Sequence, residues 1–222
     1  MNPFRGLKGW YALEGNPDDS GPEHHAGVNV GGMTYGPGKI GRCGVFNGTD
    51  SYIRLDPTVC PVTKTLPFSM AAWVKPEPMT DYGTIAANSH YDNTFGYQFC
   101  LDKDGKVGLY WSWGDWWDGG LTTTDVAPNS VWTHVAATFN GDYPIAGLRL
   151  YLNAVSCPFA RDFLVGCGDV IGNYDSVIGC FLYYGYTPTQ MFKGSIDEVV
   201  FADRTLSDQE IYQLYIGGTP ME

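Results

Sequence analysis

Apolar and polar residues alternate with a period of two along much of this chain, and this pattern limits its fold more than any other feature. Successive side chains of a β-strand point to opposite faces, so alternation predicts strands that bury one face in a core. In residues 131–139, for example, Val131, Val135 and Phe139 share one face. Similar alternation predicts half-buried strands at residues 68–75, 106–111 and 148–153.

Turn residues separate these strands and indicate one all-β domain. The 29 glycines and 14 prolines among 222 residues make turns frequent and long helices unfavourable. Asp104-Gly105 is a strong hairpin signal because a type I′ turn needs positive φ angles, and Asn47-Gly48 and Asn140-Gly141 follow other predicted strands. No linker, internal repeat or low-complexity segment interrupts residues 1–222. We therefore expect a single domain, an antiparallel β-sandwich of two sheets.

One short helix is predicted near the C-terminus. Ser207 lies three residues before Glu210, the spacing of a capping box, in which each side chain satisfies a free backbone N–H of the other residue. Ile211 and Leu214 then share an apolar stripe, and Gly217 marks the end of the helix. We expect this helix to lie as a lid across one end of the sandwich.

Charge and apolar content disfavour two classes of partner. The 13 basic and 24 acidic side chains give a net charge of −11, which phosphate backbones and anionic membranes repel. The longest apolar stretches, such as Phe68 to Val74, are far shorter than the ~20 residues that span a bilayer. We therefore expect neither a nucleic-acid partner nor a membrane partner.

The cysteines leave two interpretations open. None of the six forms a C-x-x-C pair, so neither a zinc ribbon nor thioredoxin-like chemistry is supported. Their even number permits three disulfides, but buried free thiols explain the same residues equally well. Cys157 and Cys167 flank a predicted loop and are the first candidate for a disulfide.

An ordered series of short motifs runs through the chain and resembles a known family. The series is W-Y-A-L-x-G at 10–15, D-S-G at 19–21, G-x-x-G-V-F-N-G-T-D-x-Y-I at 41–53, F-S-M-A-A-W-V-K-P at 68–76, W-x-H-V-A at 132–136, L-Y-L-N at 150–153, F-K-G-S-I-D-E-V at 192–199 and L-S-x-x-E-I-x-x-L-Y at 206–215. In this order the motifs resemble the LamG-like jelly-roll family, within the concanavalin A-like lectin/glucanase group. The resemblance covers nearly the whole chain and implies two antiparallel sheets packed face to face, one of them concave. It implies little about function, because this fold carries lectins, adhesion modules, enzymes and virion components.

The resemblance also implies a structural Ca²⁺. Many members bind it near an early D-x-S-G loop and a late I-D-E-V strand, which here makes Asp18, Asp19 and Asp197 the expected ligands. Such a site suits Ca²⁺, which takes six to eight oxygen ligands from carboxylates and carbonyls. The alternative is that Asp19 makes an Asx turn and that Asp197 accepts hydrogen bonds from backbone amides.

The chain departs from the family at one hairpin. Many members have Tyr-x-Asp-Gly where this chain has Tyr151-Leu152-Asn153-Ala154. Because alanine resists positive φ, we expect this hairpin to turn later or differently.

Residues 110–120, YWSWGDWWDGG, form an aromatic run whose tryptophans cannot all enter one core from one strand. We expect Trp116 and Trp117 to lie in a loop flanked by Gly and Asp and to contact a ligand or a partner. Aromatic rings stack on sugars and anchor protein interfaces. The competing interpretation is that this loop folds back and plugs the end of the sandwich. The other candidate ligand-binding residues are Trp113, Asp115, Asp118, Tyr91, Tyr183 and Tyr184.

No catalytic pattern is found, so we expect a non-catalytic attachment or decoration module. Related glucanases use an E-x-D-x-x-E strand, which none of the glutamates starts, and G-x-S-x-G is absent. Residues 1–15 contain no apolar leader, and bacteriophages often encode lone LamG-like modules as virion surface proteins. We therefore expect a capsid, collar or fibre protein that binds a protein partner, a cell-surface glycan or both, with a homo-oligomer as one arrangement. A secreted carbohydrate-binding module is the alternative, and a glycoside hydrolase is less favoured.

Overall fold

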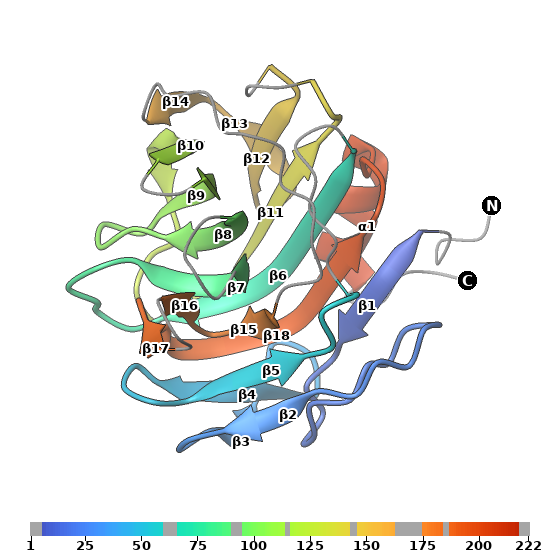
Figure 1. The fold of residues 1–222 in the computed structure, drawn as a ribbon, viewed down its shortest axis with the longest axis vertical. Coiled ribbons are helices and arrows are strands. Elements are labelled where there is room, and N and C mark those ends of the chain that lie inside the picture. The colour runs from blue at the N-terminus through green and yellow to red at the C-terminus, as the bar shows by residue number, and fades with distance from the viewer. Residues whose placement is uncertain are drawn as a thin grey trace.

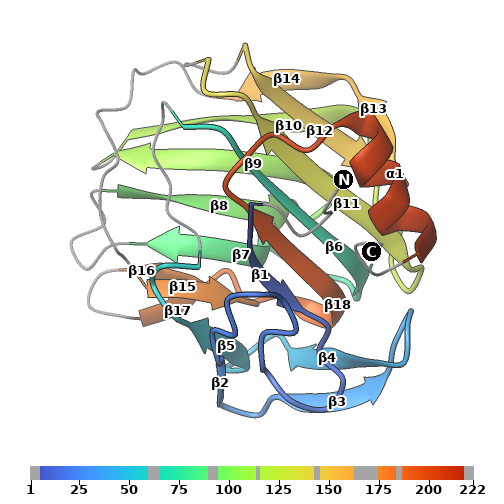
Figure 2. The same ribbon diagram turned by 90° about the vertical axis from the view of Figure 1, so that its right-hand side faces the viewer.

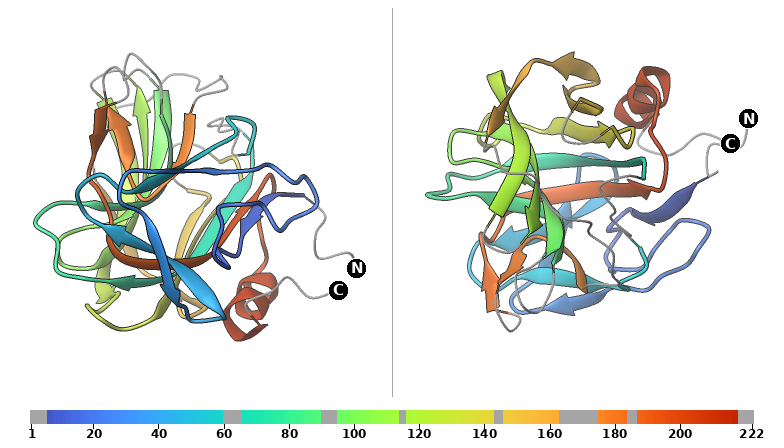
Figure 3. Two further views of the ribbon diagram at one scale, coloured as in Figure 1. Left: turned by 90° about the horizontal axis from the view of Figure 1, so that it is seen from below. Right: turned by 45° about the horizontal axis from the view of Figure 1, so that its top comes forward.

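Two large antiparallel sheets pack face to face, as the alternation predicts (Figure 1 and Figure 3). The computed structural model describes residues 6–59, 66–89, 95–113, 116–142, 146–162, 175–183 and 187–217. Within these residues the chain is mostly strand, with one short helix, α1 (Asp208–Gly217). The expected all-β sandwich with a C-terminal helix is therefore confirmed.

The first sheet brings the earliest and the latest strands of the chain together. Its spatial order is β13 (Val155–Cys157), β12 (Leu148–Leu152), β11 (Thr133–Phe139), β6 (Phe68–Pro76), β18 (Lys193–Ala202), β4 (Arg42–Asn47) and β3 (Thr34–Pro37). In addition, β1 (Leu7–Tyr11) pairs with β18.

The second sheet is built mainly from the middle of the chain. Its spatial order is β14 (Phe159–Asp162), β10 (Trp116–Val126), β9 (Lys106–Trp113), β8 (Phe95–Leu101), β7 (Gly83–Ser89), β15 (Asp175–Ile178), β5 (Tyr52–Leu55) and β2 (Val28–Val30). A separate hairpin pairs β16 (Phe181–Tyr183) with β17 (Thr187–Thr189).

Aromatic side chains fill the space between the sheets. Phe68 and Phe139 of the first sheet meet Trp111 of the second, with ring centroids 6.1 and 5.2 Å from the indole. All three side chains are buried, and full burial of a large apolar side chain contributes about 1.5–3 kcal/mol. The alternating faces of β6, β9, β11 and β12 supply this core, as their sequences predict.

The central strands are buried on both faces, whereas their alternation predicted only one buried face. Every residue of β11 is buried, and in β6 only Lys75 is not. The second face is covered because α1 packs on it, which is a tertiary contact that no pattern within a strand reports. Val131 lies before β11 and is 51% exposed, so its expected place in the core is also wrong.

Helix α1 lies against the outer face of the first sheet, where Figure 2 shows it beside β11 and β12. Its Ile211 and Leu214 pack with Ala71 and Ala136, so the helix covers a sheet face and is not a lid on one end. The predicted capping box is confirmed: the Ser207 N–H donates to Glu210 Oε2 at 2.9 Å, and the Glu210 N–H donates to Ser207 Oγ at 3.3 Å.

Two hairpins show how turn chemistry was predicted correctly once and wrongly once. Gly105 has a φ of +85° in the β8–β9 turn, as expected. The β12–β13 hairpin, however, turns at Asn153 and Ala154, which have φ angles of +47° and +63°. Alanine therefore adopts the conformation that we expected it to avoid.

Candidate ligand-binding site

A pocket of about 410 Å³ opens beyond the C-terminal end of β6. It is formed by the β6–β7 connection, the residues before β18 and the β4–β5 turn. We call it the Tyr82 pocket, and it is lined by Gly48, Pro78, Met79, Thr80, Asp81, Tyr82, Gln190, Met191 and Lys193. The lining of this pocket thus includes an aromatic ring, a carboxylate, an amide and an ammonium group. Ligand pockets typically combine such apolar walls with a few polar groups that fix orientation.

The Tyr82 ring is held in place by the second sheet. It packs edge-on against Tyr110 of β9, with centroids 5.9 Å apart and an interplanar angle of 83°. The backbone N–H of Tyr82 donates a hydrogen bond to Asp81 Oδ1 at 2.7 Å. The aromatic wall of the pocket is therefore fixed before any ligand arrives.

Gln190 is held in a backbone conformation that non-glycine residues seldom adopt, with a φ of +47°. Such a conformation costs about 1–2 kcal/mol, and strain of this kind concentrates at functional sites. Its carbonyl accepts the Thr84 N–H at 3.0 Å, and its Oε1 accepts Gln98 Nε2 at 2.6 Å. Because Oε1 is occupied, the Nε2 group of Gln190 is left to donate to a ligand.

A buried cross-strand pair supports both walls of the pocket. Gln98 of β8 is directly opposite Tyr110 of β9, and both are buried. Gln98 also donates to Thr84 Oγ1 at 2.7 Å, which satisfies both hydrogens of its amide nitrogen. Gln98 thereby orients Gln190, while Tyr110 orients Tyr82.

The β16–β17 hairpin covers the neighbouring part of the second sheet's outer face. Phe181 and Leu182 of this hairpin cluster with Tyr52, Ala87 and Val177. Tyr183, one of the predicted ligand-binding residues, ends β16 and is 40% exposed. The hairpin therefore leaves the β8–β9 part of this face, with Gln98 and Tyr110, to support the Tyr82 pocket.

The predicted aromatic surface is corrected in one respect. Trp116 and Trp117 begin strand β10 and do not lie in a loop, because β9 and β10 pair up to Trp113 and Trp116. Trp111 of the same run is buried between the sheets. The side chains of Trp113, Trp116, Trp117 and Asp118, and residues Tyr91, Asp115 and Tyr184, lie outside the described part of the structure.

The expected calcium ligands do not form a metal site together. Asp19 Oδ1 accepts the N–H groups of Trp10 at 2.8 Å and Gly21 at 2.7 Å, and Oδ2 accepts that of His25 at 3.1 Å. Asp19 thus binds backbone amides, which was the alternative interpretation, and Asp18 is exposed. Among the residues that the structure describes, no group of three or more His, Cys, Asp or Glu side chains is placed to hold a metal ion.

Asp197 nevertheless keeps one unused oxygen. Its Oδ2 accepts the N–H groups of Lys39 at 2.8 Å and Ile40 at 3.0 Å, whereas Oδ1 is buried without a hydrogen-bond partner. Burial raises the pKa of Asp197 to about 6, and the charge of Glu14 adds to this shift. Glu14 and Asp197 therefore form an acidic neighbourhood with an unsatisfied oxygen.

The adjacent Glu198 belongs to a β-bulge. The register between β18 and β6 shifts between Asp197 and Val200, and Glu198 has a φ of +52°. Its Oε2 accepts Trp10 Nε1 at 2.6 Å. Burial raises the pKa of Glu198 to about 8, and the neighbouring charges of Asp197 and Glu14 add to the shift. The bulge thus turns this carboxyl into the interior, where it bonds to an indole.

The candidate disulfide is not formed. Cys157 is a free, buried thiol that donates to the Val155 carbonyl at 3.3 Å, and Cys167 lies outside the described residues. Cys157 belongs to the core between the sheets, which explains its burial without a covalent partner. Cys43, Cys100 and Cys180 are also free and buried.

The Tyr82 pocket was not predicted because no sequence motif marks it. Its residues come from three segments that are far apart in the chain and individually resemble ordinary turns. The antiparallel β6–β18 pairing places Pro76 opposite Gly194. The segment that follows Pro76 must therefore lie beside the segment that precedes Gly194. That strand pairing is the signal that would have located the pocket.

Comparison with known proteins supports the fold and the family. A family model described as the Concanavalin A-like lectin/glucanases superfamily matches residues 47–212, well over half of the chain. A comparison with curated protein sequences finds no match. Domain 4 of AbnA, a GH43 extracellular arabinanase from Geobacillus stearothermophilus, was solved in complex with arabinotriose. It is 26% identical with a TM-score of 0.73, over 94% of this chain and 98% of that one.

Two more distant structures share the fold alone. The botulinum neurotoxin serotype C1 binding domain is 12% identical with a TM-score of 0.67, and the match covers 98% of this chain but only 53% of that domain. The CBM40 of Ruminococcus gnavus IT-sialidase, bound to α2,3-sialyllactose, is 15% identical with a TM-score of 0.55, over 68% of this chain and 84% of that one. With the jelly-roll sandwich and the family-model match together, the chain belongs to the concanavalin A-like lectin/glucanase superfamily.

Proposed function

We propose that this chain is a non-catalytic carbohydrate-binding module whose ligand occupies the Tyr82 pocket. The observation that carries the proposal is the pocket itself, whose lining combines a tyrosine ring packed on the second sheet with polar groups, of which Gln190 is held by a buried network. The likeness to domain 4 of AbnA supports it, because that domain was solved with arabinotriose and the match covers nearly all of both chains.

Each polar group has a distinct part in binding a sugar. The Tyr82 ring provides an apolar face for stacking. Asp81 accepts a hydrogen bond from a sugar hydroxyl, and Gln190 Nε2 donates one. Lys193 is also a donor, since its ion pair with Glu77 is 3.4 Å long and exposed, and such pairs contribute little.

The test is a calorimetric titration with arabinotriose and a panel of other neutral oligosaccharides. Tyr82→Ala should weaken binding at least tenfold, because the stacking surface is lost. Tyr212→Ala is the matched control, since Tyr212 is an exposed tyrosine on α1. Equal affinities for Tyr82→Ala and the unmodified chain would refute the assignment of the pocket.

We infer that the module does not hydrolyse its ligand. Glycoside hydrolysis needs two carboxyl groups that flank the scissile bond. Among the carboxyl groups that the structure describes, those of Asp197 and Glu198 have pKa values raised to about 6 and about 8, but both are buried and neither lines the Tyr82 pocket. Release of reducing sugar from arabinan by the purified chain, and its loss in Glu198→Gln, would establish the opposite.

We further propose that binding serves attachment or decoration at a virion surface, with a protein partner, a cell-surface glycan or both. Tyr212 and Ile216 support a protein partner, because both are exposed on α1 and offer apolar surface to another subunit. A secreted carbohydrate-binding module is the alternative. Mass spectrometry of purified particles tests this: the chain should be present in them, and its recovery only as a free protein would refute the proposal.

We also propose that Ca²⁺ binds beside Asp197. The unpartnered Asp197 Oδ1 and the nearby Glu14 support this, since a cation would offset their repulsion. Asp19 is not a ligand in this proposal, because its oxygens already bind amides. A chelator should lower the melting temperature of the unmodified chain but not that of Asp197→Asn. An unchanged melting temperature of the unmodified chain would end the proposal.

No helix in the described ranges has the length and apolar character to cross a membrane.

A further inference from the structure

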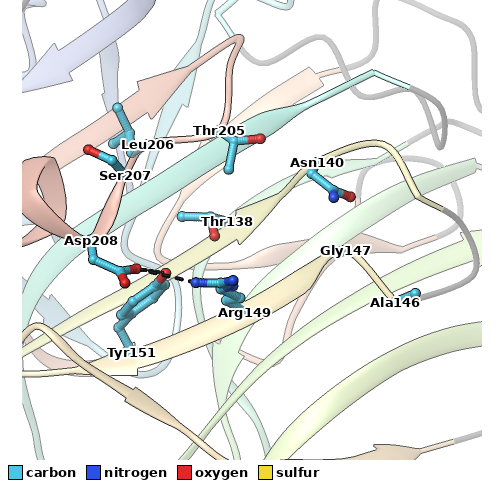
Figure 4. Close-up of a pocket in the computed structure, with 10 residues that line it drawn as sticks. All are labelled: Thr138, Asn140, Ala146, Gly147, Arg149, Tyr151, Thr205, Leu206, Ser207 and Asp208. Atoms are coloured by element: carbon cyan, nitrogen blue, oxygen red, sulfur yellow. Dashed lines mark hydrogen bonds and ion pairs between the residues drawn. The ribbon is translucent and has the colours of Figure 1, made fainter.

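A second pocket, of about 400 Å³, lies on the outer face of the first sheet beside the start of α1 (Figure 4). We call it the Thr138 pocket, and its polar lining includes Thr138, Asn140, Arg149, Tyr151, Ser207 and Asp208. Thr138 of β11 is opposite Ser69, near the N-terminal end of β6. The Tyr82 pocket lies beyond the other end of this strand, so the two pockets are separated by the length of β6, about 25–30 Å at 3.3 Å per residue.

An arginine and an aspartate form the open side of the Thr138 pocket, and the side chain of the buried Tyr151 lies against them. The Tyr151 hydroxyl donates to Asp208 Oδ1 at 2.7 Å, and Arg149 forms an ion pair with the same oxygen at 3.5 Å. Asp208 Oδ2 takes part in neither contact. The side chains of Arg149 and Asp208 are 62% and 68% exposed, so a ligand can reach both.

Thr138 supplies an unused polar group at the base of this pocket. It is buried, and its hydroxyl has no hydrogen-bond partner. Burial raises the pKa of Tyr151, and the nearby Thr138 hydroxyl opposes this shift, although the two groups do not meet in hydrogen-bond geometry. Figure 4 shows the Thr138 hydroxyl turned toward Tyr151 and Arg149. Because buried polar groups are nearly always paired, an unpaired one that faces a pocket indicates a missing ligand group.

The charges of the pocket identify the class of ligand. The charges of Arg149 and Asp208 cancel. An anionic ligand would be repelled by the carboxylate, and a cationic ligand would be repelled by the guanidinium. A sugar hydroxyl both donates and accepts, so two adjacent hydroxyls suit an arginine and an aspartate that lie side by side. Arg149 is directly opposite Thr138 in the β11–β12 pair, so its exposed side chain and the Thr138 hydroxyl lie on the same face of the sheet.

We propose that the Thr138 pocket is a second binding site, for a neutral saccharide, independent of the Tyr82 pocket. One chain then holds two glycans at opposite ends of β6. Binding to a surface that displays many glycans is strengthened by such bivalency without any additional contact.

The experiment is a nuclear magnetic resonance titration with arabinotriose, xylotriose and maltotriose. The backbone amide signals of residues 138, 149 and 207 report on the Thr138 pocket, and those of residues 80–82 and 190 report on the Tyr82 pocket. At millimolar ligand we expect saturable shifts of the first group with at least one of the three sugars. No saturable shift of the first group with any sugar would overturn the proposal, whatever the second group does.

Two variants separate binding from folding. Thr138→Val keeps the shape of the side chain and removes an unpaired hydroxyl, so it should fold at least as stably while it weakens binding at this pocket at least tenfold. Arg149→Gln should weaken the same site and leave the Tyr82 pocket unchanged. Thr124→Val is the matched control, because Thr124 is an exposed threonine in β10. Unchanged affinity of Thr138→Val at this pocket would contradict the proposal.

Discussion

At the scale of single residues, Ala154 shows how a neighbouring strand can decide the conformation of a turn. Its φ of +63° is one that glycine would adopt more easily. The preceding Asn153 accepts the His134 N–H on Oδ1 at 3.1 Å and donates its own N–H to the His134 carbonyl at 2.8 Å. These bonds to β11 fix the two-residue turn, whatever residue follows. The sequence alone does not reveal them, so the expectation of a different turn was wrong.

Ala154→Gly should therefore stabilise the protein. Relief of the left-handed alanine gains about 1–2 kcal/mol, and the extra flexibility of glycine in the unfolded chain costs about 0.5–1 kcal/mol. We expect a net gain of up to ~1.5 kcal/mol in the free energy of unfolding, measured by chemical denaturation. Ala160→Gly, at an exposed β14 position without positive φ, should lose stability instead. Equal losses in both variants would contradict this explanation.

His134 is a second residue whose environment sets its chemistry. It lies beneath α1, with ring centroids 5.4 Å from Trp73 and 6.0 Å from Tyr215. Burial lowers the pKa of His134 to about 3. The folded protein therefore keeps this imidazole neutral at a pH where an unfolded chain protonates it.

The pH dependence of stability follows from this difference. Between pH 6.5 and pH 3 the unfolded state binds a proton at His134 and the folded state does not. The free energy of unfolding therefore falls as the pH falls through this range. His134→Phe keeps an aromatic ring and removes the titration. In denaturation curves across this range, the variant should lose stability less steeply, by at most ~1.4 kcal/mol per pH unit. The same slope in both proteins would show that His134 does not titrate in this way.

At the scale of elements, α1 depends on its cap. Glu210 accepts from Ser207 and from Arg204 Nη2, the latter at 2.6 Å, and these bonds hold the pKa of Glu210 at about 2. Ser207→Ala should cost about 1 kcal/mol of stability, as loss of a cap usually does. Ser156→Ala, at an exposed β13 position, is the control and should change stability little. If both variants unfold alike in urea, the cap does not stabilise the helix measurably.

The elements also show how far the sequence predicts the fold. The period of two located β6, β9, β11 and β12, and the Ser207–Glu210 spacing located α1, because these signals are local. The double burial of β6 and β11 was not predicted, since it depends on where α1 packs. Trp116 and Trp117 were assigned to a loop because Gly and Asp flank them, whereas the β9–β10 pairing extends further than those residues indicated.

At the scale of the whole molecule, the fold was predictable and the pockets were not. Each pocket is assembled by strand pairs that join distant segments, as β6 and β18 join Pro76 to Gly194. The residues concerned, such as Tyr82 and Gln190, are isolated polar or aromatic residues with no characteristic spacing. Asp197 was expected as a calcium ligand from the family motif and stays a prediction, whereas its expected partner Asp19 binds backbone amides. The sandwich is thus specified locally, and the two pockets only by the complete topology.

The central claim is that this molecule holds a carbohydrate and leaves it intact. Binding of arabinotriose by calorimetry, followed by chromatography of the recovered sugar, tests both halves in one sample. We predict saturable binding that Tyr82→Ala weakens at least tenfold, with all of the trisaccharide recovered uncleaved. Recovery of arabinose or arabinobiose, or binding that is indifferent to Tyr82, would contradict the claim.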